Sequence, residues 1–142
     1  MTRLRERSER GAASVELVLL APVVLLVVAM MVGGARLWLA RAAVADAAQA
    51  GSRAATLEYG AGQASVSGAA AAREGLVDIP CATNAVEIDA SGFAVAVGQP
   101  ARVTATVRCD VPLADLFGLG LPGTITVEAT TASALDTYRR RE

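Results

Sequence analysis

The sequence contains no histidine and no lysine among its 142 residues. Histidine is the usual general base and metal ligand near neutral pH, and lysine supplies the amine of Schiff-base catalysis. The neighbouring carboxylates, Glu87 with Asp89 and Asp110 with Asp115, are expected on a solvent-facing strand and in a loop. There is no nucleophile elbow, phosphate-binding glycine loop or metal-ligand cluster. We therefore predict a protein that is not an enzyme, with no metal, cofactor or small-molecule substrate.

The chain also lacks a concentration of positive charge and has few aromatic residues. All 13 basic residues are arginine, they are scattered, and the formal net charge is −1. Such a distribution gives no basic stripe to neutralise a phosphate backbone, so we predict no nucleic-acid partner. Aromatic residues make up 4% of the chain. Any folded domain must therefore have a thin core of small side chains.

One long apolar run is present near the start. Residues 17–35 carry no charge, and a helix of this length covers roughly 29 Å, close to the hydrocarbon thickness of a bilayer. The run follows a short segment with more basic than acidic residues, and such segments usually stay in the cytoplasm. The basic residues are Arg3, Arg5, Arg7 and Arg10, against Glu6 and Glu9. We expect a single-pass protein of the cell membrane, with a cytoplasmic N-terminus and an extracytoplasmic C-terminal domain.

The helical pattern continues beyond the run, to about residue 57. Small and apolar residues recur at spacings of three and four, which predicts one long helix with a narrow packing face. This face consists of Leu37, Ala40, Val44, Ala47, Gly51 and Ala54. Gly51 marks a place where bulk is not tolerated. Pro22 favours a kink or local unwinding inside the run. Gly33 and Gly34 make a second position at which the helix is expected to be weak.

The rest of the chain changes period. We expect a short helix over residues 64–74, closed by Gly75. From residue 80 onward apolar and polar residues alternate, which predicts strands near 86–89, 93–97, 103–109 and 125–129. The predicted fold class is α+β: a long N-terminal transmembrane and stalk helix packed on a small antiparallel sheet of three to four strands. We expect the apolar loop 113–122 to tuck under the sheet with Phe117 in the core, the alternative being an exposed docking patch.

Two cysteines, Cys81 and Cys109, follow the predicted span, and in an exported domain they are expected to form a disulfide. Two buried thiols are the alternative, and a metal site is disfavoured by the wide spacing and the absence of histidine.

The N-terminal motif resembles a known family. Gly11 is followed by four residues, then Glu16 and the apolar run, which resembles the prepilin processing site of type IV pilin-like proteins. Residues 10–22, including Pro22, look like the opening of the TadE family, pseudopilins of the tight-adherence (Flp) pilus systems. Segments 47–53 and 98–138 are also similar to the family.

The resemblance implies a pilin-like fold and cleavage by a prepilin peptidase between Gly11 and Ala12. Together with the residue pattern, it divides the chain into a leader (1–11), a transmembrane and stalk helix (12–57), a connector with a short helix (58–79) and an extracytoplasmic β domain (80–142). Glu16 would then act in assembly, Pro22 and Gly51 in helix packing. The implied partners are the peptidase, other pilins and pseudopilins of the same system, and an inner-membrane assembly platform.

Two other interpretations remain open. Residues 43–45, Ala-Val-Ala, resemble a signal-peptidase site, so the chain could be an ordinary secreted domain. It could also be a permanently anchored single-pass protein with an extracellular binding domain. We favour the pilin-like interpretation over secretion because the apolar run exceeds a typical signal-peptide core, and because residues 43–45 lie inside a predicted helix.

Overall fold

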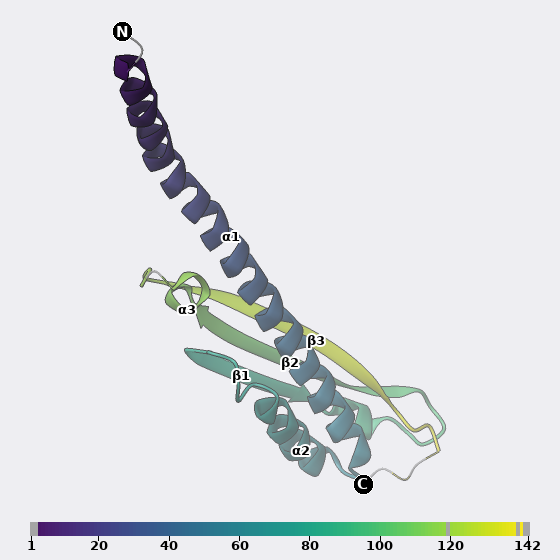
Figure 1. Cartoon of the computed structure of the whole chain (residues 1–142). Coiled ribbons are helices and arrows are strands. Elements are labelled where there is room, and N and C mark those ends of the chain that lie inside the picture. Colours follow the sequence, from purple (N-terminus) through teal and green to yellow (C-terminus); the bar gives the residue numbers. More distant parts are fainter. Residues whose placement is uncertain (1–2, 119, 139, 141–142) are drawn as a thin grey trace.

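The computed structural model describes residues 3–118, 120–138 and 140, with side chains from residue 18 onward. A 55-residue helix, α1 (Arg3–Leu57), is followed by α2 (Ala61–Glu74), β1 (Thr83–Asp89), the 3-10 helix η1 (Ser91–Ala94), β2 (Ala101–Pro112), α3 (Leu113–Phe117) and β3 (Thr124–Leu135). The N-terminal half of α1 projects away from the sheet, and its C-terminal half lies across it, beside α2 (Figure 1). The predicted α+β class and the long helix are confirmed.

The sheet has three antiparallel strands in the order β1-β2-β3, with β2 in the centre. Alternate residues of β2 are buried beneath α1, and the residues between them face outward. The buried set is Val103, Ala105, Val107, Cys109 and Val111. This period of two is what a sheet with one covered face requires.

The C-terminal half of α1 buries a stripe of small residues against the sheet and α2. The buried positions are Ala40, Val44, Ala47, Ala48, Gly51, Ser52 and Ala55. Their spacing of three and four keeps them on one face of the helix. Ser52 and Ala55 extend the predicted stripe, while Ala54 is only half-buried. Because the stripe has so little bulk, neighbouring backbones come close to α1.

Gly51 lies at the closest approach of α1 and α2. A Cβ atom built on Gly51 would lie 3.0 Å from the Ala72 Cβ and 3.0 Å from the Gly68 carbonyl oxygen. Gly68 faces Gly51 in return, and its own Cβ would lie 2.9 Å from the Gly51 carbonyl oxygen. The two glycines therefore let the helix backbones touch directly.

The predicted strand at 93–97 is wrong. Residues 91–94 form η1, whose first turn is fixed by the Ser91 N–H donating to the Asp89 carboxylate at 2.9 Å. Phe93 is buried, but Val95 and Val97 are 38% and 52% exposed, so they share no covered face. β2 already pairs with β1 on one side and with β3 on the other, so no free position remains beside the central strand.

Two smaller expectations also need correction. α1 is helical through Pro22, Gly33 and Gly34, without the local unwinding expected as an alternative to a kink. Asp110 lies in β2 and Asp115 in α3, so these carboxylates do not share a loop. The short predicted helix is present and begins at Ala61, three residues earlier than expected.

Candidate functional site: the apolar helix and its junction with the sheet domain

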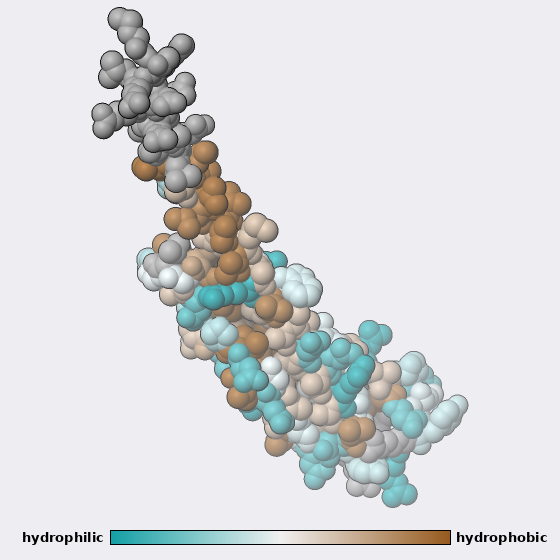
Figure 2. Space-filling view, viewed as in Figure 1, coloured by the Kyte–Doolittle hydropathy of each residue, from teal (hydrophilic) through white to brown (hydrophobic). Residues whose placement is uncertain are grey.

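The apolar half of α1 has no protein around it. Almost every described side chain between residues 18 and 32 is exposed, on all sides of the helix, with Leu19 at 69% and Met31 at 70%. The most apolar 18-residue window of α1 has a mean hydropathy of 2.6, and α1 is the one helix among the described residues long and apolar enough to cross a membrane. Figure 2 shows this surface as a brown band between the grey N-terminus and the sheet domain. An apolar surface of this kind requires a bilayer or other apolar helices as its surroundings.

The residues predicted for processing and assembly lie at the start of this helix. Gly11, Ala12 and Glu16 fall within α1, in the part whose side chains lie outside the described residues. Pro22 lies in the exposed apolar half, far along α1 from Gly51 in the packed half. The structure therefore places Pro22 on a surface free for other molecules, whereas Gly51 packs inside its own domain.

A polar link between α1 and the sheet was missed by the sequence analysis. The Ser52 hydroxyl is fully buried, lies 3.1 Å from the Gln49 carbonyl oxygen and is hydrogen-bonded to the Ser133 hydroxyl of β3 at 2.8 Å. A buried hydroxyl needs such partners, since an unpaired one costs about 1 to 3 kcal/mol. The signal was a serine at a packing position of an alanine-rich helix. The link fixes the stalk on β3.

A second contact joins α1 to α3 near the end of the charge-free run. The Arg36 guanidinium donates to the Asp115 carbonyl oxygen at 2.5 Å. One turn earlier, the Phe117 ring packs so closely on Gly33 that a Cβ atom there would overlap the ring. The expectation that Phe117 enters the core is met only in part: Phe117 is half-buried and packs against the edge of the core, while Leu116 is buried within it at 2% exposure. Gly33 is a packing position, because only a residue without a side chain leaves room for the ring.

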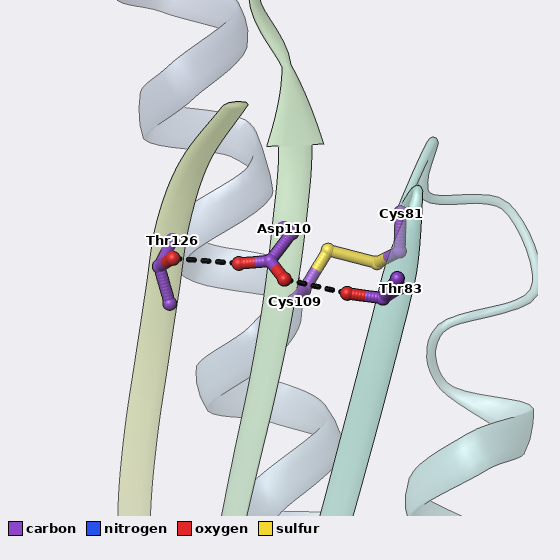
Figure 3. The surroundings of a disulfide bond; sticks show 5 residues. All are labelled: Cys81, Thr83, Cys109, Asp110 and Thr126. Carbon is purple, nitrogen blue, oxygen red and sulfur yellow. Dashed lines mark hydrogen bonds between the residues drawn. A yellow bond between two sulfur atoms is a disulfide. The ribbon is translucent and has the colours of Figure 1, made fainter. Parts of the chain in front are cut away.

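The face of the sheet opposite α1 is polar, whereas the disulfide lies at one end of the covered face. Cys81 and Cys109 are bonded, with their Cα atoms 5.4 Å apart. Cys109 points into the core and Asp110, the next residue, points outward, as alternate strand residues do. Figure 3 shows the Asp110 carboxylate between the Thr83 and Thr126 hydroxyls, which donate to its two oxygens. The carboxylate thus ties all three strands together.

These hydrogen bonds lower the pKa of the Asp110 carboxyl below its usual value of 3.8, Thr126 being the larger cause and Thr83 the second. Further along the same face, the Arg108 Nε lies 2.9 Å from a Glu128 carboxylate oxygen. The hydrogen bond from Arg108 lowers the pKa of Glu128 as well. Asp110 is half-buried and Glu128 exposed, and both carboxylates are paired to residues of the same face, which stabilises the sheet.

Asp110→Asn should flatten the acid dependence of stability. The folded-state pKa of Asp110 lies below its unfolded value, so its contribution is complete above that value and is lost as the pH falls through the folded pKa. Wild type should therefore exceed the variant in stability at neutral pH, and the difference should shrink in strong acid. Thermal unfolding at a series of pH values measures this, with Thr126→Val as a milder comparison that keeps the carboxylate. An unchanged difference across the series would contradict the assignment.

Comparison with known proteins points to the same helix. Residues 11–53 match the family model described as TadE-like protein. This part of the chain is TadE-like. The resemblance inferred from the N-terminal motif is thereby confirmed over these residues, and the family suggests a component associated with a Tad pilus. No curated protein and no solved structure gives a significant match to the chain.

The TadE-like match coincides with one structural unit. It begins at Gly11, runs through the uncovered apolar surface and ends at Arg53, one residue after the buried Ser52. α2 and all three strands lie outside it. The family likeness therefore belongs to α1, and the sheet domain lies beyond the matched residues.

Proposed function

We propose that this TadE-like chain is a pseudopilin of a Tad (Flp) type IV pilus, processed by a prepilin peptidase and packed against other pilins through α1. The observation that carries the proposal is the uncovered apolar half of α1, which continues without interruption into a stalk fixed to the sheet. Such a helix can lie in the cell membrane, N-terminus inside, and can later bury the same surface against neighbouring subunits. The sheet domain then faces the extracytoplasmic side, where its disulfide persists.

The proposed role of Glu16 rests on charge compensation. Cleavage after Gly11 creates an ammonium at Ala12, four residues before the Glu16 carboxylate. In a bundle of apolar helices an unpaired charge costs several kcal/mol. Pairing of Glu16 with the Ala12 ammonium of a neighbouring subunit neutralises both and sets the register between the two helices. The glycine before the cleaved bond allows the peptidase backbone to approach closely.

The packing of the stalk argues against the secreted-domain alternative. Signal-peptidase cleavage after Ala45 would remove Ala40 and Val44 from the chain, and these side chains are 5% and 0% exposed in the domain core. It would also cut α1 beside the buried Ala47. A mature domain starting at Asp46 would lose part of its own core. The permanently anchored protein remains the second candidate, since its helix would have the same exposed surface.

The N-terminal residue of the mature protein, purified from its own host, separates these functions. Ala12 is the expected result for the pseudopilin, and an intact leader is expected for a permanent anchor. Asp46 would instead identify a secreted domain. Mass spectrometry of the intact chain gives the answer, and material with no cleavage beside Gly11 would overturn the proposal.

Glu16→Ala should leave cleavage largely intact and strongly reduce pilus assembly, because the Ala12 ammonium loses its partner. The readout is the ratio of assembled to membrane-bound protein in sheared-pilus and membrane fractions, with the N-terminal residue determined in each. Glu87→Ala, on the outward face of the sheet, is the matched control and should assemble normally. Normal pili from Glu16→Ala would rule out the proposed role of this carboxylate.

A further inference from the structure

The loop that follows β2 runs alongside the apolar half of α1. Leu25, Leu26, Ala29 and Met30 of α1 face Phe117 and Leu121 of this loop across a cavity of about 310 Å³, lined by these six apolar residues. Leu121 is 43% exposed, and Phe117 is half-buried against Gly33. In Figure 1, α3 and this loop lie at the end of the sheet nearest the projecting half of α1. The sheet domain therefore extends beyond Arg36, the first charged residue after the apolar run, toward the N-terminal half of α1.

On both sides of this cavity, the charged residue next to the apolar segment lies at the same level along the axis of α1. On α1 the charge that bounds the apolar run is Arg36, and on the other side it is Asp115 of α3, just before the loop. The Arg36 hydrogen bond to the Asp115 carbonyl oxygen places these residues side by side. Beyond them, residues 17–35 of α1 and residues 116–123 of the loop carry no charge. The two segments share one boundary between polar and apolar surroundings.

The loop reaches deep along α1 measured from that boundary. Met30 lies six residues before Arg36 and Leu25 eleven, distances of roughly 9 and 16 Å along a helix. Half the hydrocarbon thickness of a bilayer is about 15 Å. If α1 crosses the membrane with Arg36 at the outer surface, Met30 lies within the outer leaflet and Leu25 close to the middle of the bilayer. Water at this depth is excluded, and the apolar loop fits those surroundings.

We propose that the loop, in its described residues 116–118 and 120–123, inserts into the outer leaflet beside α1, so that lipid acyl chains cover Leu121 and the cavity between the loop and Leu25, Leu26 and Met30. The inference rests on the proposed membrane stage of the function and adds a second, shallower anchor to it. Arg36 and Asp115 then lie at the headgroup level. Together with the Phe117 contact on Gly33, this anchor holds the end of the sheet against the membrane instead of leaving the domain free on a stalk.

Depth-dependent fluorescence quenching tests the insertion. The chain has one tryptophan, Trp38. The Trp38→Phe variant is therefore a full-length protein without tryptophan fluorescence and with its disulfide intact. Leu121→Trp reports on the loop, with Phe117→Trp as a second, conservative reporter. Met30→Trp reports on α1 at the same height, and Val97→Trp reports on the opposite end of β2, where Val97 is 52% exposed. Each variant is reconstituted in phosphatidylcholine vesicles that carry bromine atoms at a series of acyl-chain depths.

The expected result is quenching of Leu121→Trp and Met30→Trp at similar acyl-chain depths, with Val97→Trp unquenched. If Met30→Trp is quenched but Leu121→Trp and Phe117→Trp are not, the insertion of the loop is overturned, while the proposal that α1 spans the membrane stands. In that case a blue-shifted loop emission would identify a second copy of the chain as the cover, and a red-shifted one would identify water. Absence of quenching at Met30→Trp as well would overturn the membrane stage of the proposed function itself.

Discussion

Replacing Cys81 and Cys109 together by alanine is expected to lower the free energy of unfolding of the sheet domain by about 3 to 4 kcal/mol. The disulfide closes a loop with a sequence separation of 28 residues, and a crosslink of that length restricts the unfolded chain by this amount in the loop-entropy description. Removal of the fully buried Cys109 sulfur adds a packing loss. Denaturant unfolding of the full chain in detergent micelles, followed by hydrogen exchange of the β2 amides, measures the change.

Reduction of the wild-type protein provides the matched control. A thiol reductant should produce most of the same loss in wild type and none in the double variant, since only wild type has a bond to break. Equal exchange protection in oxidised and reduced wild type would show that the disulfide does not limit opening of the sheet.

Gly51→Leu is expected to destabilise the domain by about 3 kcal/mol or more, because its side chain would meet the backbone of α2. The Gly68 carbonyl oxygen and the Ala72 Cβ lie 3.0 Å from where even a Cβ atom would lie. Neither is the flexible end of a long side chain, so relief requires α2 to move off α1. Thermal unfolding of the full chain in micelles measures the loss.

Gly62→Leu is the control for Gly51→Leu. Gly62 lies in α2, and no described atom lies within 4 Å of the point that a Cβ atom on it would occupy, so the same substitution there has room. It should change stability by less than about 1 kcal/mol and in the favourable direction, because leucine is a better helix former than glycine. A loss at Gly62→Leu as large as that at Gly51→Leu would show that the close approach of α1 and α2 does not decide the effect.

The long helix and the sheet were predictable because each obeys a local period. The charge-free run and the small residues at spacings of three and four indicated α1, and alternation indicated β2 and β3. Where the period was short, prediction failed: the alternation at 93–97 came from only three apolar residues, and turn formation at Ser91 with burial of Phe93 outweighed it. The disulfide, expected from cysteine placement, joins Cys81 to Cys109 in the structure.

The residues of the candidate site also fall into those that the sequence predicted and those that only the structure revealed. Gly11, Ala12 and Glu16 were found from their spacing alone, because recognition of a processing site depends on residues adjacent in sequence. The Ser52 link to Ser133 and the Phe117 contact on Gly33 join residues more than eighty positions apart. Periodicity reports which face of an element is apolar, but it contains no information on which distant element covers that face.

By itself, the sequence determined that the chain has one membrane-length helix, a small sheet with one covered face, and an N-terminal motif of the TadE kind, because hydropathy, period and spacing are properties of neighbouring residues. Only the tertiary structure decided that Gly51 meets Gly68, that Leu116 is buried more deeply in the core than Phe117, and that Phe117 and Leu121 lie beside the apolar half of α1. These contacts depend on how α1 crosses the sheet, and that crossing is set by the packing of small side chains against distant backbone.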